Sequence, residues 1–280
     1  MSISPKERKY LKNKHKGGKN NSKGNIYESY YTTYCIADFM NRNMSRLNSI
    51  YFTSQLENCF VDDLLIEDSV SSHRIYHQIK DVKNLTWKTK RLKYDFEKQK
   101  YISSEAGENF ELKLIHSNPI EMVNPIPCEI VSCTSTFFFP AGRSLNQLIL
   151  SYSPFKEAIK NIAASANSED DELLGIAETI LGIWVGSKQK QISLIMISDE
   201  VRKLGQGYVN IKTYPDIRIS EYCEKLFQRF NLRFYTCGIN LYWSNSNGTL
   251  KGSIEWTPEM EQKLEKTEFS DFWNLIELLS

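Results

Sequence analysis

FVDDLLIEDSVSSHRIYHQIK, residues 60–80, holds two apolar runs that flank a polar turn. Phe60–Ile66 and Arg74–Lys80 are rich in Ile, Val, Leu, Phe and Tyr, which favour strands. Asp68–Ser72 between them is short and polar, as expected of a connection between neighbouring strands. The stretch therefore predicts an antiparallel β-hairpin.

Three polar side chains of this hairpin are expected to meet. With the turn at its midpoint, Asp63 on the first strand stands opposite Gln78 on the second. Gln78 and Lys80 are two residues apart, so they project from the same face of their strand. A carboxylate can hold Mg²⁺, a side-chain carbonyl adds a hard oxygen ligand, and an ammonium stabilises negative charge or positions an attacking water. Each residue taken singly would be an ordinary turn or strand end, but together they indicate a metal-dependent site.

Strands and helices continue on both sides of the hairpin. The other elements predicted for this half are a helix from about Tyr27 to Arg46–Asn48, a strand at Ile50–Gln55, a helix at 86–102 capped by Thr86, and strands at Phe110–His116 and Glu129–Phe139. After Pro140-Ala141-Gly142 the apolar spacing is mainly helical, and Asn245-Ser246-Asn247-Gly248 predicts the turn of a late hairpin. A last helix is expected to open at Thr257-Pro258-Glu259. We therefore expect an α/β fold with a mixed sheet flanked by helices, followed by a mostly helical C-terminal region with a terminal β-hairpin.

The arrangement Asp…Gln-x-Lys on a hairpin entered from a helix resembles the PD-(D/E)XK nuclease superfamily in its Gln variant. More narrowly, three short stretches are similar to motifs of anti-phage effector endonucleases: Gly24 with Tyr27-Glu28 and Tyr30-Tyr31, then Asp62-Asp63-Leu64, then Tyr76-His77-Gln78-Ile79-Lys80. These are the endonuclease domains of cyclic-oligonucleotide signalling systems and the nuclease subunits of Lamassu-type systems. The resemblance covers about residues 17–100. It implies a restriction-endonuclease-like fold that hydrolyses DNA with Mg²⁺ (or Mn²⁺).

The resemblance also implies roles for individual residues. Asp63 would be the metal-binding aspartate, Gln78 the second ligand and Lys80 the catalytic lysine. Glu28, on the preceding helix, matches a position that can complete the site. Gln78 brings no negative charge where the family usually has an acid, which should weaken metal binding.

Two other acids can supply the missing charge. Asp62 can share or take over the metal-binding role of Asp63, because a slip of one residue in strand register exchanges their faces. Glu57 is the second such acid. His77 is expected on the strand face opposite Gln78, where it is packed or solvent-facing rather than catalytic.

The N-terminal segment, residues 1–23, is basic and is expected to be a flexible arm. The first 24 residues carry eight Lys or Arg and one acid, about +7, whereas the rest of the chain sums to about −6. Such an arm can neutralise DNA phosphates, although a solvated tail without a partner explains the composition equally well. The side chains predicted to contact DNA are Lys12, Lys14, Lys16 and Lys19 in the arm, and Lys83 and Lys88 after the hairpin.

Composition excludes several other classes of protein. The six cysteines form no Cys-x-x-Cys pair and there are four histidines, so neither a zinc site nor a disulfide framework is expected. No apolar run approaches the roughly 20 residues that span a bilayer, so no membrane partner is expected. These observations favour a cytoplasmic protein with reduced thiols.

Three parts are predicted: the arm at 1–23, a nuclease domain at 24–140, and an α-rich interaction or oligomerisation region at 141–280. Apolar stripes at Leu173–Ile183 and Phe269–Leu279 are expected to supply contacts between copies of the chain or with partners. The resemblance to Lamassu-type nucleases implies a defence complex in which the partner is an SMC-like ATPase.

The function expected is a Mg²⁺-dependent DNA endonuclease, an effector subunit of bacterial anti-phage defence whose activity depends on assembly. Two alternatives stand beside it. One is a catalytically inactive, nuclease-like DNA-binding module, which the missing acid at Gln78 suggests. The other is a structural subunit that bridges partners, which the second half of the chain suggests because it holds no catalytic constellation.

Overall fold

The structure is a computed structural model that describes residues 4–19, 22–118, 125–142, 144–165, 167–187, 189–205, 207–211, 219–237, 240–245, 250–269 and 271–279. By its contacts the chain divides into two compact units. The first consists of Met1–Arg42 and Leu47–Ile211, and the second of Asn43–Arg46 and Lys212–Ser280. None of the described helices combines the length and apolar character needed to cross a membrane.

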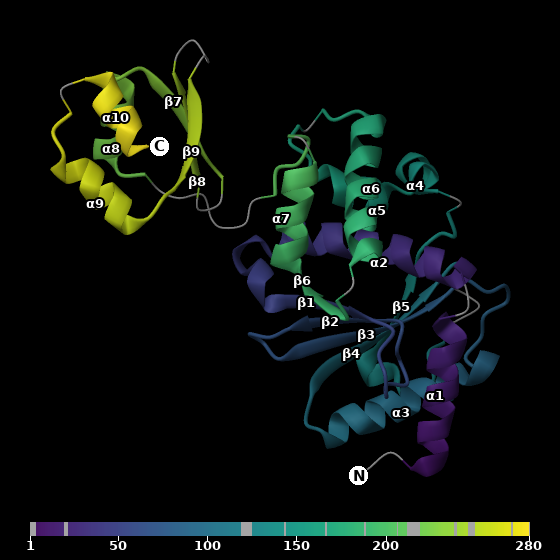
Figure 1. The fold of residues 1–280 in the computed structure, drawn as a ribbon. Coiled ribbons are helices and arrows are strands. Elements are labelled where there is room, and N and C mark those ends of the chain that lie inside the picture. Colours follow the sequence, from purple (N-terminus) through teal and green to yellow (C-terminus); the bar gives the residue numbers. More distant parts are fainter. Residues whose placement is uncertain are drawn as a thin grey trace. The chain divides into compact units, whose positions relative to one another are not determined.

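A six-stranded mixed sheet forms the centre of the first unit (Figure 1). Its strands are β1 (Ile50–Ser54), β2 (Leu64–Asp68), β3 (His73–Lys80), β4 (Asn109–His116), β5 (Thr134–Phe138) and β6 (Gln191–Ser193). They lie in the order β5-β4-β3-β2-β1-β6, with β3, β4 and β5 parallel and the remaining neighbours antiparallel. The expected α/β fold with a mixed sheet is confirmed.

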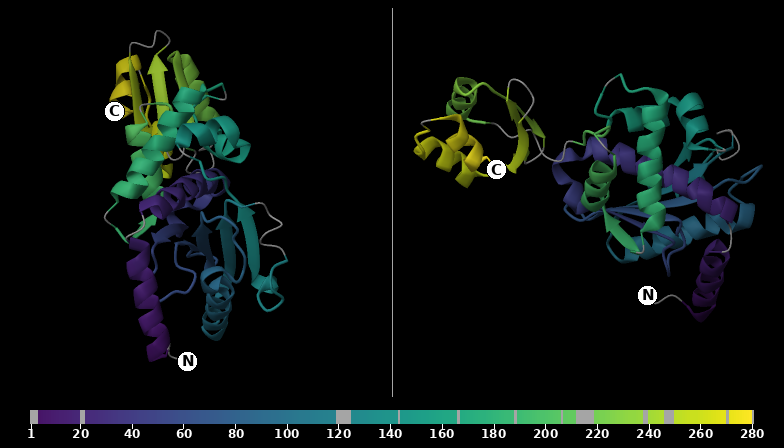
Figure 2. Two further views of the ribbon diagram at one scale, coloured as in Figure 1. Left: turned by 90° about the vertical axis from the view of Figure 1, so that its right-hand side faces the viewer. Right: turned by 45° about the horizontal axis from the view of Figure 1, so that its top comes forward.

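Helices cover both faces of this sheet (Figures 1 and 2). One face carries α2 (Ser22–Arg42), α4 (Leu145–Ser151), α5 (Ser153–Lys160), α6 (Asp170–Gly186) and α7 (Leu194–Leu204). The other face carries α3 (Leu92–Glu105), beside which lies α1 (Pro5–Lys19). Because β2 is covered on both sides, Leu64 and Ile66 pack toward α2 while Leu65 packs toward α3. Strands buried on both faces usually consist of consecutive apolar residues, as residues 64–66 do.

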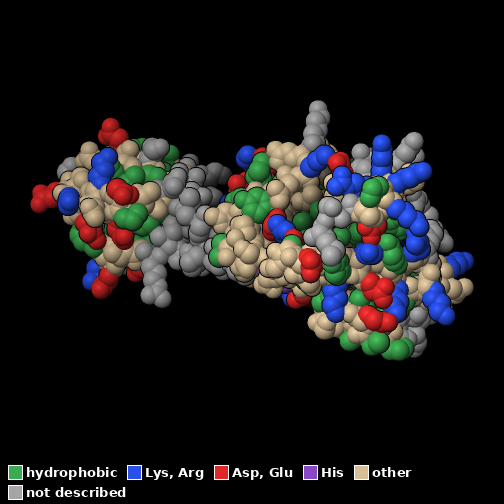
Figure 3. All heavy atoms as spheres, turned by 90° about the horizontal axis from the view of Figure 1, so that it is seen from below, with side chains coloured by type: hydrophobic (Ala, Val, Ile, Leu, Met, Phe, Trp, Pro, Cys, Tyr) green, Lys and Arg blue, Asp and Glu red, His purple; other side chains and the backbone are tan. Residues whose placement is uncertain are grey.

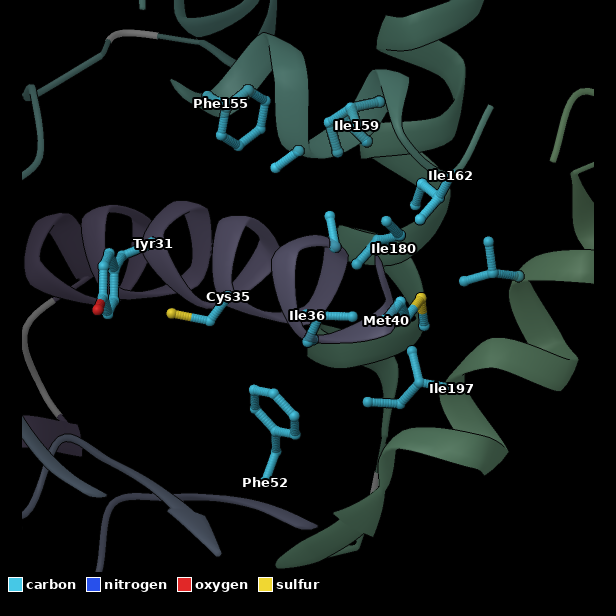
Figure 4. Packing of buried hydrophobic residues seen from close by; sticks show 14 of the residues in the cluster. Tyr31, Cys35, Ile36, Met40, Phe52, Phe155, Ile159, Ile162, Ile180 and Ile197 are labelled. Carbon is cyan, nitrogen blue, oxygen red and sulfur yellow. The ribbon is translucent and has the colours of Figure 1, made fainter. Parts of the chain in front are cut away.

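The larger core lies between the sheet and α2 (Figure 4). Ile36 and Met40 of α2 are buried together with Phe52 of β1, Ile180 of α6 and Ile197 of α7. The spacing of three and four among the apolar residues of α2 produces this single buried face.

The first unit extends well past residue 140. Ile192 of β6 pairs with Phe52 of β1, so a strand from the second half of the chain completes the sheet. Residues of α6 and α7 share one core with α2. A boundary near residue 140 would cut through this core, and the structure instead divides the chain after Ile211. The prediction of separate domains at 24–140 and 141–280 is therefore corrected.

The basic N-terminal segment is also not a free arm. Residues 5–19 form α1, in which Leu11 is buried. The Tyr10 ring stacks on Phe60 with centroids 6.2 Å apart, and the Tyr10 hydroxyl donates to Asp95 of α3. Tyr10 and Leu11 give an otherwise basic helix enough apolar surface to pack against the first unit.

The second unit contains a three-stranded antiparallel sheet of β7 (Leu232–Cys237), β8 (Asn240–Asn245) and β9 (Lys251–Glu255). Its helices are α8 (Glu221–Arg229), α9 (Pro258–Lys266) and α10 (Phe272–Leu278). The predicted late hairpin corresponds to β8 and β9, and β7 pairs with the other edge of β8 to make a three-stranded sheet. The predicted turn lies largely outside the described residues. As expected, α9 opens at Thr257-Pro258, and Thr257 caps the helix by accepting from the Met260 amide.

The two apolar stripes expected to join copies of the chain are used inside their own units. Leu173, Ile176 and Ile180 are buried in the core of the first unit. Phe269, Leu275 and Leu279 are buried in the core of the second. These side chains are therefore not available as docking surfaces.

Candidate active site

The predicted cross-strand pair lies at the start of β2. Leu64 pairs with His77 and Leu65 with Tyr76, a register that brings Asp63, directly before β2, level with Gln78. The Gln78 side-chain amide donates to Asp63 Oδ2. The same oxygen accepts from the Ile79 backbone amide at 2.7 Å. The register predicted from the sequence is confirmed.

Lys80 completes the predicted group. Its Nζ lies 2.9 Å from Asp63 Oδ2, and its side chain is 26% exposed. Alternation along β3 puts His77 on the opposite face, where its ring packs on Tyr31 with centroids 5.7 Å apart. Burial lowers the pKa of His77 to about 3, so this imidazole is neutral and structural. Asp63, Gln78 and Lys80 are in contact, and His77 is not part of the group.

A second set of contacts centres on Lys14 of α1. Lys14 Nζ lies 3.0 Å from Asp62 Oδ1 and 3.1 Å from Asp95 Oδ2. It also donates to Gln78 Oε1 at 3.0 Å and to the carbonyl oxygen of Phe60. Gln78 therefore joins the two sets, because its amide nitrogen faces Asp63 and its oxygen faces Lys14.

Sequence reasoning missed Asp95 and the ion pairs of Lys14. Asp95 lies in the first turn of α3 and is buried, next to the fully buried Phe96. An acid on the apolar face of an amphipathic helix was the available signal. Lys14, predicted to contact DNA, forms ion pairs with the buried carboxylates of Asp62 and Asp95 in this structure.

Glu28 of α2 lies close enough to these charged side chains for their charges to shift its pKa. Gln55 Nε2 donates to Glu28 Oε2 at 2.9 Å, and the Gln55 backbone amide donates to the Asp63 carbonyl at 3.2 Å. Gln55 has a φ of 52°, an uncommon conformation for a residue with a side chain, and it thereby links α2 to the start of β2. Burial, with repulsion from Asp63, raises the pKa of Glu28 to about 8, although Lys80 acts in the opposite direction.

The pKa values of Asp62 and Asp95 shift in the same direction. Burial and the charge of Asp63 raise the pKa of Asp62, and burial raises the pKa of Asp95, with Lys14 opposing both shifts. Burial alone would lower the pKa of Lys14, but the carboxylates of Asp62 and Asp95 outweigh it and raise that pKa. The carboxylates outnumber the two lysines, so a proton on Glu28 or an added cation would relieve the remaining repulsion.

The donor set suits a hard cation. Asp62, Asp63, Asp95 and the side-chain oxygen of Gln78 are all oxygen donors, which Mg²⁺ and Mn²⁺ prefer. Among the described residues, however, no group of three or more His, Cys, Asp or Glu side chains is arranged to hold a metal ion. Lysine ammonium groups contact these carboxylates instead. Glu57, the other acid considered, pairs with Lys190.

The remaining lysines predicted to contact DNA are placed differently from Lys14. Lys12, Lys83 and Lys88 have exposed side chains. Lys16 and Lys19 lie on α1, and their side chains are outside the described part of the structure. Figure 3 views the chain from the side of α1 and α3, where Lys and Arg side chains are numerous on the first unit.

Comparisons with models of protein families, with curated proteins and with solved structures found no match to this chain.

The raised pKa of Glu28 predicts a pH-dependent stability. Between an unfolded pKa of 4.5 and a folded pKa of about 8, the folded state holds a proton that the unfolded state releases. The free energy of unfolding should therefore fall as pH rises through this window, by up to about 1.4 kcal/mol per pH unit. Glu28→Gln should remove this contribution, which urea denaturation between pH 5 and 9 would measure as the difference from the wild type. Glu105→Gln, an exposed acid on α3, is the control, and equal slopes for all three proteins would contradict the assignment.

Proposed function

We propose that this chain is a Mg²⁺-dependent endonuclease that hydrolyses the phosphodiester bonds of DNA. The observation that carries the proposal is the contact among Asp63, Gln78 and Lys80 on neighbouring strands, with Lys80 Nζ 2.9 Å from Asp63 Oδ2. A carboxylate and an amide oxygen can hold a metal ion, and an ammonium group can stabilise negative charge on a phosphate, so these three side chains can serve metal-assisted phosphodiester hydrolysis. The buried acids Asp62 and Asp95 add negative charge that would draw a divalent cation to the same place.

The roles of the side chains follow from their positions. Asp62, Asp63 and the Gln78 side-chain oxygen would hold Mg²⁺ or Mn²⁺, which when bound acts as a Lewis acid and lowers the pKa of water. The Lys80 side chain lies beside Asp63, where it would stabilise the charge that develops on a phosphate in the transition state. Glu28, with a pKa of about 8, holds a proton near neutral pH and can donate or accept one.

The direct test is cleavage of supercoiled plasmid by the purified full chain. Conversion to nicked or linear DNA is expected with Mg²⁺ or Mn²⁺ and not with EDTA. Parallel reactions on single-stranded DNA and on RNA define the substrate. Absence of cleavage under all of these conditions, by a protein that binds DNA, would favour the alternative below.

The alternative is a nuclease-like DNA-binding module without catalysis. Two features favour it: Gln78 stands where an acid would strengthen metal binding, and both carboxylate sets are contacted by lysines. This alternative predicts DNA binding that is unaffected by EDTA. The two proposals are therefore separated by one assay of binding and cleavage on the same plasmid.

Exposed lysines next to the site are expected to contact DNA. Lys83 and Lys88 lie in the loop between β3 and α3, directly after Lys80. Replacing both by Gln should weaken DNA binding and reduce the slope of log Kd against log salt by about 0.9 for each phosphate that is no longer neutralised. Fluorescence anisotropy over a range of salt concentrations measures this slope. Lys225→Gln, an exposed lysine of α8 in the second unit, is the control, and a reduction of equal size there would contradict the assignment.

The motif resemblance supports a narrower proposal about context. An effector nuclease of bacterial anti-phage defence would act together with partner subunits, one of them an SMC-like ATPase, because unrestrained DNA cleavage would damage the host. The test is phage plating on cells that carry the chain with its neighbouring genes, compared with cells that carry Lys80→Met. Equal plating on both strains would contradict this context and leave the cleavage assay unaffected.

A further inference from the structure

Four oxygen atoms surround one ammonium group in the first unit. Lys14 Nζ reaches Asp62 Oδ1 at 3.0 Å, Gln78 Oε1 at 3.0 Å and Asp95 Oδ2 at 3.1 Å, and it also contacts the Phe60 carbonyl. The oxygens come from the segment before β2, from β3 and from α3, whereas the ammonium comes from α1. Three separate parts of the chain thus build one oxygen-lined position for a cation.

This position offers more acceptors than a lysine can use. An ammonium group has three N–H donors, so it cannot satisfy four oxygens with separate hydrogen bonds. A set of two carboxylates, an amide oxygen and a backbone carbonyl is instead the kind of ligand set that hard divalent cations take. A cation with a larger coordination number than an ammonium group could use all four of these oxygens.

Apart from Lys14, the helix α1 is attached to the first unit mainly through Tyr10 and Leu11 among its described side chains. Leu11 is buried, Tyr10 contacts Phe60 and Asp95, and Glu7 pairs with Lys98 at the surface. The sequence of α1 contains seven Lys or Arg, so its departure from Asp62 and Asp95 would free a strongly basic segment. DNA phosphates would favour such a segment in its released position.

We propose that α1 is an internal plug whose Lys14 ammonium competes with a divalent cation for the oxygens of Asp62, Gln78, Asp95 and Phe60. The inference rests on the proposed function, because it concerns control of the same site. It adds Asp95 and the Phe60 carbonyl to the ligands, and it gives the N-terminal helix a regulatory role. Binding of the cation requires α1 to withdraw, so the apparent affinity is reduced by the fraction of molecules in which α1 is docked.

Mn²⁺ binding to the full chain, in the absence of DNA, tests the competition. Lys14→Met removes the charge and keeps the length of the side chain, and isothermal titration should show Mn²⁺ bound roughly tenfold more tightly or better than in the wild type. Lys9→Met, an exposed residue on the same helix, is the matched control and should bind Mn²⁺ as the wild type does. Adding Asp95→Asn to Lys14→Met should abolish the gain.

Hydrogen exchange of the wild type gives a second readout that needs no variant. Saturating Mn²⁺ should speed amide exchange across residues 5–19 while the strands β2 and β3 stay protected. Unchanged exchange in α1 at saturation, or equal affinity of Lys14→Met and wild type, would overturn the plug and leave the nuclease proposal standing. Competition for Mn²⁺ without any DNA cleavage would overturn the nuclease proposal and leave the plug standing. Failure of both proteins to bind Mn²⁺ would overturn both.

Discussion

Asp63→Asn and Lys80→Met should each reduce Mg²⁺-dependent DNA cleavage by about a thousandfold or more. Asp63 Oδ2 receives hydrogen bonds from Gln78, Ile79 and Lys80, so this carboxylate organises the whole group. Loss of a metal ligand or of a charge beside the phosphate costs several kcal/mol, and each 1.4 kcal/mol or so is tenfold in rate. Initial rates on supercoiled plasmid measure the loss.

The controls for this experiment come from the same hairpin. Asn and Met preserve the volume of the side chains, and thermal unfolding checks that each variant is folded. Glu67→Gln, at the far end of β2 where Glu67 pairs with Arg74, should cleave as the wild type does. If Asp62→Asn loses cleavage while Asp63→Asn keeps it, Asp62 is the principal ligand. If every variant cleaved DNA normally, the assignment of the active site to these residues would be wrong.

Phe139→Ala should destabilise the entire first unit by about 3–5 kcal/mol, as expected for a fully buried aromatic side chain. Its ring lies 5.4 Å from that of Tyr31 in α2 and 5.6 Å from that of Tyr152, which precedes α5. The cavity left by the substitution therefore weakens packing on both sides of residue 140. Urea denaturation followed by hydrogen exchange would report β1–β5 and α4–α7 losing protection together.

The adjacent residue provides the matched control. Phe138 is 42% exposed, so Phe138→Ala should cost less than about 1 kcal/mol. If residues 24–140 and 141–211 of Phe139→Ala unfolded in separate transitions, the result would support a domain boundary near residue 140. A fragment that ends at residue 211 should retain the native exchange pattern of the first unit, whereas one that ends at 140 lacks β6 and much of the core.

The hairpin could be predicted because residues close together in the sequence determine it. Asp63 and Gln78 are 15 residues apart, and a symmetric turn between two apolar runs fixes their register. The apolar spacing of α2 was likewise readable, since a helix that buries one face repeats every three to four residues. Such features depend on neighbouring residues, so they can be predicted without knowledge of the rest of the fold.

The other half of the site depends on contacts between distant residues. Lys14 and Asp95 are 81 residues apart, and no local pattern indicates that α1 and α3 lie side by side. The start of α3 was also mispredicted: the helix begins at Leu92, after Arg91 with a φ of 65°, and Thr86 does not cap it. Asp95 therefore sits near the positive end of the helix, a position that its place in the sequence does not reveal.

The short strand β6 is synthesised long after β1, so one edge of the sheet stays unpaired for part of the time in which the chain is made. Tyr51, Phe52 and Thr53 of β1 pair with residues 191–193, about 140 residues further along the chain. At ribosomal speeds of roughly 5–20 residues per second, this edge of the nascent sheet waits on the order of ten seconds for its partner. An unpaired strand edge can recruit the same edge of another newly made chain. Variants that weaken β6 should therefore lower the yield of soluble protein during rapid expression more than they lower the stability of the finished molecule.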